Sequence, residues 1–270
     1  MTAAEHWQTE LAAWAIPNHL LAAVDDSPYR WPVELFRRRN ISAAESEAPP
    51  TFEIVSRLAG AGGSVLDIGA GTGRASLPLA LSGHPVTAVE RSAEMASALR
   101  EEAAALEDRY EVIEEAWPMS TGVFDVVMAA HVVYDVSAIE PFLVAMASHA
   151  RRGVVLEMTE THPWTPLGPY YRALHGIERP KGPSVDELVA VIREVFDVVP
   201  EVVRWERPGG TWFESWEEIE EVYRRRLVLP PDRVGELRAL LGPDLEVVEG
   251  RMTLGDTVRR LATVWWSTAG

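Results

Sequence analysis

Three glycines at alternate positions, Gly69, Gly71 and Gly73, follow a short apolar run that contains Asp67. Glycine lets the backbone turn at φ values that other residues resist, and it leaves no side chain between the backbone amides and a ligand. The apolar run before the glycines and the helical pattern after them predict a strand, a tight turn and a helix. This unit is the first crossover of an open α/β sheet, whose carboxyl edge binds ligands.

The spacing of the glycines separates two kinds of cofactor. A dinucleotide fingerprint has the form G-x-G-x-x-G, whereas this loop has the form G-x-G-x-G and places Arg74 where the third dinucleotide glycine belongs. Glu90 ends a second predicted strand, and a carboxylate there can accept hydrogen bonds from both hydroxyls of a ribose while it repels a 2′-phosphate. The glycine spacing thus weakens the prediction of a nicotinamide site, and Glu90 is a candidate contact for a ribose.

The glycine loop resembles motif I of the class I S-adenosylmethionine-dependent methyltransferases, and the resemblance extends over about residues 52–158. Ser92 caps a predicted helix that carries Met95, residues 109–113 predict a third strand, and residues 123–130 match the "FDxV" segment of the family's fourth strand. The resemblance implies a doubly wound α/β fold with a mostly parallel seven-stranded sheet. It also implies S-adenosylmethionine as the cofactor and methyl transfer as the activity.

The resemblance also suggests which residues contact the cofactor. Glu90 is expected on the ribose, Met95 near the adenine, and Glu115 where the family often has an acid for the exocyclic amine, with Trp117 packing on the ring. An arginine of an N-terminal lid often holds the cofactor carboxylate in this family, and Arg37, Arg38 and Arg39 are equal candidates. The expected cofactor residues are Asp67, Gly69, Ala70, Gly71, Gly73, Glu90, Arg91, Met95, Glu115, Ala116, Trp117 and Ala130.

The transfer step needs few catalytic groups, because the sulfonium already activates the methyl group. The protein must exclude water, align the acceptor and, where the acceptor is protonated, supply a base. His131 directly follows the fourth strand and His162 follows the fifth, so both are candidate catalytic bases. Either histidine can instead have only a packing or backbone role. Tyr134 and Asp135 are expected to line the acceptor pocket.

Composition excludes several other chemistries. The 270-residue chain has no cysteine, which removes disulfides, thiolate metal sites and the cysteine-dependent methylation of pyrimidine C5. No metal site is expected, because Glu157 and Glu160 are interpreted as solvated or capping carboxylates. No apolar run approaches the ~18 residues of a membrane span, and the N-terminus does not resemble a signal peptide, so a cytoplasmic protein is expected.

The charge argues against a nucleic-acid partner. The chain has 41 acidic and 25 basic side chains and a net charge of −16, whereas nucleic-acid binding needs a basic surface. The largest basic clusters include Arg224–Arg226, which follows Glu220 and Glu221 at a spacing of four residues. This spacing predicts ion pairs on a solvated helix face.

The remaining segments divide the chain into two parts. Residues 1–48 are predicted to form an N-terminal helical lid, in which Trp7, Leu11 and Trp14 share one face, although this face can also serve packing alone. Residues 49–270 are predicted to form the methyltransferase domain. A helical insertion around 209–243, with helical patterns at 215–227 and 231–241, precedes the last strand at 258–266. Residues 159–183 are predicted to be a structured loop.

The sequence thus predicts an S-adenosylmethionine-dependent methyltransferase that acts on the oxygen or nitrogen of a small or medium-sized acceptor. The alternatives are a nicotinamide-dependent oxidoreductase and a non-catalytic S-adenosylmethionine-binding protein. The acceptor, the need for a general base and the oligomeric state remain open at this level.

Overall fold

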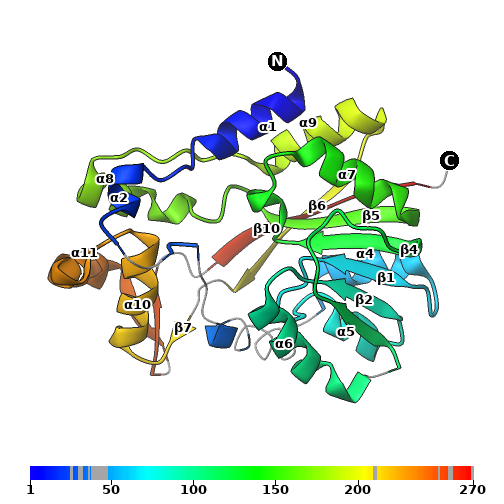
Figure 1. Ribbon diagram of the computed structural model, residues 1–270, viewed down its shortest axis with the longest axis horizontal. Helices are drawn as coiled ribbons and strands as arrows, with labels where there is room; N and C mark the ends of the chain where they lie inside the picture. The colour runs from blue at the N-terminus through cyan, green and yellow to red at the C-terminus, as the bar shows by residue number, and fades with distance from the viewer. Residues whose placement is uncertain are drawn as a thin grey trace.

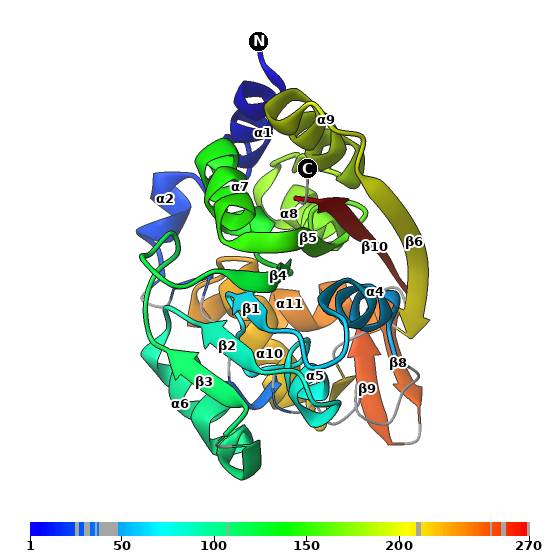
Figure 2. The ribbon, with the colours of Figure 1, turned by 90° about the vertical axis from the view of Figure 1, so that its right-hand side faces the viewer.

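Seven strands form one twisted sheet with helices on both faces (Figures 1 and 2). The computed structural model describes residues 1–24, 27–29, 33–35, 37, 48–106, 108–208, 212–248, 250–254 and 258–268. The strands lie in the order β3 (Tyr110–Ile113), β2 (Val86–Val89), β1 (Val65–Ile68), β4 (Phe124–Ala130), β5 (Ala150–Thr159), β10 (Val258–Ser267) and β6 (Glu201–Pro208). The predicted fold class is confirmed.

The strand directions bring the predicted ligand-binding residues to one edge. β1 to β5 are parallel to one another, and β10 is antiparallel to both β5 and β6. The strand order reverses between β1 and β4, which creates a crevice at their carboxyl ends. Arg259 at the start of β10 pairs with Arg207 at the end of β6, so the C-terminal strands reach the same edge.

Two layers of helices cover the sheet because each helix has one apolar face. α4 (Pro50–Ala59), α5 (Leu77–Leu81) and α6 (Ala93–Glu102) pack on one face, with Val55, Leu79 and Leu99 in the core. α1 (Ala3–Ala12), α7 (Ile139–Ser148) and α9 (Val185–Phe196) pack on the other face. Ser184 and Glu187 form a capping box that fixes the start of α9.

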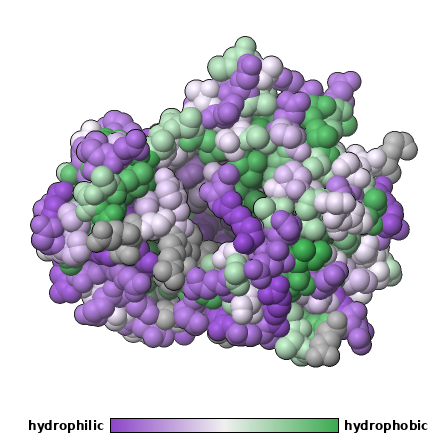
Figure 3. Space-filling model, in the orientation of Figure 1, coloured by the Kyte–Doolittle hydropathy of each residue, from purple (hydrophilic) through white to green (hydrophobic). Residues whose placement is uncertain are grey.

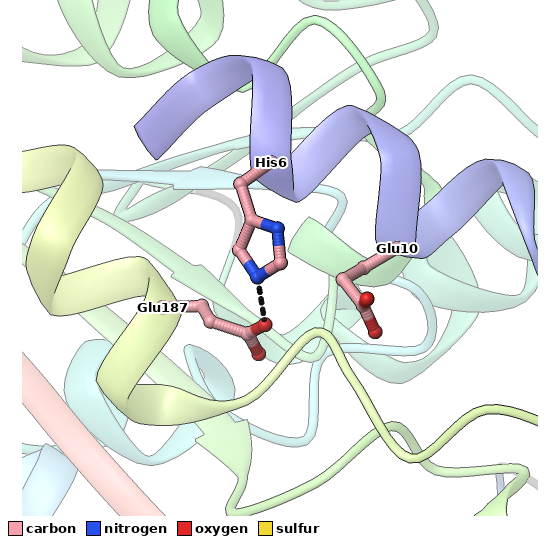
Figure 4. A group of neighbouring side chains, drawn as sticks. All are labelled: His6, Glu10 and Glu187. Carbon is pink, nitrogen blue, oxygen red and sulfur yellow. Dashed lines mark hydrogen bonds and ion pairs between the residues drawn. The ribbon is translucent and has the colours of Figure 1, made fainter. Parts of the chain in front are cut away.

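α1 is held to this second layer by polar contacts as well as by apolar packing. The indole nitrogen of Trp7 donates to the carbonyl of Val136 at 2.9 Å, and Nε2 of His6 lies 2.9 Å from Oε1 of Glu187. Glu10 lies on the same face of α1 as His6 (Figure 4). Because Glu187 also accepts the amide of Ser184, this cluster joins α1 to the start of α9.

The segment between β6 and β10 forms a second, smaller layer, drawn in orange on the left of Figure 1. It contains β7 (Trp212–Phe213), α10 (Trp216–Arg226), α11 (Val234–Leu241), β8 (Leu245–Val248) and β9 (Arg251–Leu254). The two helices fall within the predicted helical patterns, but the antiparallel sheet β7-β9-β8 was not predicted. Phe213, Ile219 and Leu237 belong to an apolar cluster that also contains Ile16 and Tyr171.

Two local predictions were wrong. Residues 159–183 are not only a loop, because they contain a 3₁₀ turn at Thr165–Leu167 and α8 (Gly168–His175). Arg225 and Arg226 are not on a solvated face: Arg226 is only 4% exposed, since this side of α10 packs toward the rest of the molecule. Glu221 pairs with Arg225 as predicted, but Glu220 pairs with Arg238 of α11.

A short helix α2 (Asn18–Leu21) follows Pro17, as predicted. Arg38, Arg39 and the first residues of the predicted insertion, 209–211, lie outside the described residues. Among the helices that the structure describes, none has the length and apolar character needed to cross a bilayer.

Candidate active site

A large cavity opens at the carboxyl edge of the sheet. Its volume is about 1580 Å³, and the glycine loop, the ends of β2, β4 and β5, the C-terminal part of α1, and α10 all contribute to its walls. Figure 3 shows the hollow in the face of the molecule between the small layer and the main sheet. Single-ligand pockets usually measure ~300–1,000 Å³, so this cavity has room for two ligands side by side.

The three loop glycines have different roles. Gly71 has φ = +60°, and a Cβ atom added there would meet no atom within 4 Å, so this residue leaves open space for a ligand. A Cβ on Gly73 would lie 2.6 Å from Leu99 and 2.7 Å from Leu77. Gly73 therefore allows the loop to pack on α5 and α6. It was predicted to contact the cofactor, but it does not line the cavity.

Glu90 is buried at the end of β2 and is fixed by two backbone amides. Its Oε2 accepts the amide of Gly71 at 2.9 Å, and its Oε1 accepts the amide of Ser92 at 2.8 Å. A carboxylate oxygen has two lone pairs, so each oxygen can still accept a hydrogen bond from a hydroxyl. The geometry fits a ligand that presents two neighbouring hydroxyls, as a ribose does.

Asp67 supplies a second buried carboxyl group beside the loop. It is 1% exposed, and neither carboxyl oxygen meets a donor in full hydrogen-bond geometry among the residues that the structure describes, although the Ser76 hydroxyl is close enough to affect its pKa. Burial raises the pKa of Asp67 to about 7, and the Ser76 hydroxyl and the Arg74 guanidinium oppose only part of this rise. A buried carboxyl group of this kind fits a cationic ligand group such as an ammonium.

The other predicted cofactor residues differ in whether they line the cavity. Ala70, Arg91, Met95, Glu115, Trp117 and Ala130 line the cavity, whereas Ala116 does not. Arg37 pairs with Glu34, Glu101 and Glu102 and is thus engaged at the C-terminal end of α6. Of the three arginines proposed for the cofactor carboxylate, the only one that the structure describes already has acidic partners.

His131 lies directly after β4 and has a backbone conformation that is uncommon for a non-glycine residue. Its φ is +61°, and its amide donates to the carbonyl of Glu157 at 2.8 Å. Its Nε2 lies 3.1 Å from Oε1 of Glu157. Burial lowers the pKa of His131 to about 4, although the Glu157 carboxylate opposes the shift. Strained backbone of this kind gathers at functional sites, and here it turns His131 into the cavity wall.

Glu157 is the centre of a buried network, which corrects its prediction as a solvated or capping carboxylate. It is 1% exposed; its Oε1 accepts Nη2 of Arg74 at 2.6 Å, and its Oε2 accepts the hydroxyl of Thr51 at 2.6 Å. Thr51 also lies 2.7 Å from the hydroxyl of Thr263. The network therefore ties the glycine loop, α4, β5 and β10 together beneath His131.

Comparison with known proteins places this geometry in a family. Residues 65–153 match a family model described as a methyltransferase domain, and these residues span β1 to β5 with the glycine loop and Glu90. Residues 65–153 form a methyltransferase domain, and the order of the seven strands is that of the methyltransferase fold. S-adenosylmethionine is the cofactor of this domain. At the ligand edge of this domain Gly71 leaves open space, Glu90 presents two hydrogen-bond-accepting oxygens and Asp67 presents a buried carboxyl group. No curated protein matches the methyltransferase in sequence.

Solved structures share the fold of this methyltransferase at low sequence identity. Coclaurine N-methyltransferase bound to N-methylheliamine and S-adenosylhomocysteine is 15% identical, with 98% of this chain and 93% of that chain covered and a TM-score of 0.53. Magnesium protoporphyrin IX methyltransferase from Synechocystis PCC 6803 with bound S-adenosylhomocysteine is 14% identical, with 95% of this chain and 94% of that chain covered and a TM-score of 0.50. A putative methyltransferase from Bacillus halodurans C-125 is 12% identical, with 82% of this chain and 99% of that chain covered and a TM-score of 0.53.

The remaining predicted site residues also line the cavity of the methyltransferase. His162 stacks on Trp14 with ring centroids 3.9 Å apart, and its Nδ1 accepts the amide of Trp164 at 3.2 Å. Burial lowers the pKa of His162 to about 3. The hydroxyl of Tyr134 lies 2.6 Å from that of Thr159, and Asp135 is exposed 3.9 Å from Arg91. His162 and Tyr134 thus have hydrogen-bonded polar atoms, whereas Nε2 of His131 is buried without a hydrogen-bond partner among the described residues and has only the Glu157 carboxylate 3.1 Å away.

Sequence reasoning missed several residues of this site. Arg74 was noted only as a missing glycine, and Thr51, Arg207 and Arg259 were not singled out at all. Arg259 had one available signal, because it falls at the start of the predicted last strand at 258–266, whereas Arg207 lies outside the predicted elements. Thr51 had none, because its partners Glu157 and Thr263 are distant in the sequence.

Proposed function

We propose that this methyltransferase methylates an oxygen or nitrogen atom of a small or medium-sized acceptor held in the cavity. The observation that carries this proposal is the extent of the cavity, which continues from the glycine loop to α1 and α10 and has a volume of about 1580 Å³. A site for the cofactor alone would need less space. The methyltransferase match also displaces the nicotinamide-dependent alternative.

The N-terminal helices and the segment between β6 and β10 act as a lid in this proposal. Trp14 and Tyr29 from the N-terminal segment and Phe213 and Tyr223 from the segment between β6 and β10 line the cavity. Such walls keep water away from the reacting atoms and limit the orientations of the acceptor. They favour an acceptor with an apolar or aromatic body.

His131 is the base that we propose for a protonated acceptor. Because its pKa is about 4, the imidazole is neutral at physiological pH and has a lone pair available. The Glu157 carboxylate beside Nε2 favours the tautomer with hydrogen on Nε2, which leaves Nδ1 as the proton acceptor. Glu157 also stabilises the imidazolium that forms when His131 takes the acceptor proton. The bound cofactor supplies the activated methyl group.

Replacing His131 with alanine tests this role. We expect His131→Ala to lose at least ~100-fold in turnover, because general-base assistance contributes ~10²–10⁴ in rate, while cofactor affinity changes little. Release of S-adenosylhomocysteine in the presence of phenol and amine acceptors measures the turnover. The wild-type rate should stay high until the pH approaches about 4, and not fall near 6.5 as for an ordinary histidine.

His162→Ala is the matched control for this measurement. Its imidazole is also buried, but its Nδ1 is engaged with Trp164, so we expect a smaller loss of turnover than in His131→Ala. Full turnover in the His131 variant would show that alignment alone carries the reaction. A larger loss in the His162 variant would assign the base to His162.

A nucleic-acid acceptor is not expected. With a net charge of −16, the protein should show no measurable affinity for tRNA or duplex DNA at physiological salt, because phosphate neutralisation needs a basic surface. A gel-shift titration against both nucleic acids measures this directly. Salt-dependent binding in the micromolar range would contradict the prediction and return RNA and DNA to the set of acceptors.

A further inference from the structure

Two arginines meet at the far end of the cavity from Glu90. Arg207 near the end of β6 and Arg259 near the start of β10 are directly paired in the antiparallel register, and both line the cavity. Side chains at directly paired positions project from the same face of a sheet, with Cβ atoms ~4.5–5.5 Å apart. Like charges in this arrangement repel each other, so the pair weakens the sheet unless an anion lies nearby.

The protein itself does not supply this anion. Neither arginine forms an ion pair or side-chain hydrogen bond with the residues that the structure describes, and Nε of Arg207 is buried without a partner. Glu157 is the carboxylate that acts on Arg207, but Arg74, Thr51 and His131 already contact its two oxygens. Burial lowers the pKa of Arg207 to about 10, with the Arg74 and Arg259 charges adding to the shift.

The surplus charge is unusual for this molecule as a whole. The chain has 41 acidic side chains against 25 basic ones, and exposed arginines such as Arg204 and Arg260 have acidic partners. Around this part of the cavity the guanidinium charges of Arg74, Arg207 and Arg259 act on one another, and Glu157, which already pairs with Arg74, is the one carboxylate among the described residues that acts on Arg207. A bound anion would compensate the two that remain.

The position of the pair distinguishes it from the cofactor-binding residues. β10 and β6 are the third and fourth strands from β1 in the sheet, which places them about 14 Å and about 19 Å away at the usual strand spacing. The glycine loop, Asp67 and Glu90 all lie at the ends of β1 and β2. The strands that carry Arg207 and Arg259 therefore lie on the opposite side of the cavity from β1 and β2, in the part that is left for the acceptor.

We propose that Arg207 and Arg259 form an anion-binding subsite that holds a carboxylate or phosphate group of the methyl acceptor. This inference rests on the proposed transfer to an acceptor in the same cavity and narrows its substrate class to anionic molecules. The two guanidinium groups bind the anion by charge-assisted hydrogen bonds, which also orient it. The anion then fixes one end of the acceptor while His131 faces the atom that is methylated.

A pair of probes of equal shape tests the subsite. Benzoate and benzamide have the same aromatic body, but only benzoate is anionic. Each is titrated calorimetrically into protein saturated with S-adenosylhomocysteine, with inorganic phosphate as a third probe. We expect benzoate to bind at least ~10-fold more tightly than benzamide, and phosphate to compete with benzoate.

Two variants and one control assign the effect to residues. Arg207→Met and Arg259→Met should each weaken benzoate binding at least ~10-fold while affinity for S-adenosylhomocysteine changes less than ~3-fold. Arg204→Met, on β6 but with Asp186 and Glu160 as partners, should bind benzoate like the wild type. Retained affinity for S-adenosylhomocysteine also shows that the variants are folded.

Three results would overturn the proposal. Equal binding of benzoate and benzamide by the wild type would show that the cavity does not select anions, and this result needs no variant. A loss of S-adenosylhomocysteine affinity of ~10-fold or more in Arg207→Met or Arg259→Met would assign the pair to the cofactor carboxylate. Undiminished benzoate binding in both variants would place the anion elsewhere. If instead the wild type failed to bind S-adenosylhomocysteine, the proposed methyl transfer itself would fail.

Discussion

Glu157→Ala is expected to lower the free energy of unfolding by about 3–5 kcal/mol. The side chain is fully buried, and its removal leaves the Arg74 guanidinium without its carboxylate partner at 2.6 Å. Breaking a buried pair from one side costs ~3–5 kcal/mol, because an uncompensated charge remains in the interior. Urea denaturation of the purified variant at pH 7 measures the change.

Two further variants test whether the loss of stability comes from the unpaired buried charge and not from the removal of any ion pair. Glu236→Ala removes the exposed Arg233–Glu236 pair and should leave the free energy of unfolding nearly unchanged, because solvent screens this pair. The double variant Glu157→Leu with Arg74→Met removes both charges and should recover most of the stability. A Glu157→Ala protein as stable as the wild type would contradict the buried network.

The pH dependence of this stability has a definite sign. Burial by itself would raise the pKa of Glu157, but the Arg74 guanidinium and His131 outweigh it and hold the pKa well below its usual value. A group whose pKa is depressed in the folded state contributes stability above its unfolded pKa of ~4.3 and loses it at lower pH. The difference between wild type and Glu157→Ala should therefore shrink as the pH falls below about 4.

Glu90→Ala is expected to weaken S-adenosylmethionine binding by about 2–4 kcal/mol, or roughly 30- to 700-fold. The substitution removes the acceptor for two ribose hydroxyls. It also releases the amides of Gly71 and Ser92, which Glu90 fixes in the free protein. Isothermal titration with S-adenosylmethionine and S-adenosylhomocysteine measures the loss.

Glu114→Ala is the control for this titration. Glu114 lies near the same edge of the sheet but outside the cavity, where it pairs with Arg100 at 3.3 Å. Its removal should change cofactor affinity less than about twofold, because an exposed pair contributes little. Unchanged affinity in the Glu90 variant would refute the assignment of the ribose site.

The cofactor half of the site was predictable because its signals are local. Three glycines, an apolar strand and an acid at the end of the next strand each occupy a few consecutive residues, and parallel strands bring them to one edge. Glu90 and Gly71 therefore lie where the sequence predicts. Gly73 shows the limit of this reasoning, because the glycine pattern does not reveal whether the missing side chain would meet a ligand or Leu77.

The acceptor half depends on contacts between distant segments. Thr51 and Thr263 are 212 positions apart, and no periodicity connects them. Arg226 looked solvated because the acids before it have helical spacing, but tertiary packing buries that face of α10. β7 has only two residues and β8 and β9 have four each, which is too short for an alternating pattern to be distinguished from a loop.

The position of β10 also has a consequence for how the protein is made. β6 joins the main sheet only through β10, which is the last strand in sequence and is inserted between β5 and β6. While the chain emerges from the ribosome, β5 thus has an unpaired edge until residues 258–267 are available, and β6 has no partner in that sheet. Open strand edges invite association with other chains. The methyltransferase therefore completes its sheet after synthesis of β10, and the two arginines come into register in the same step.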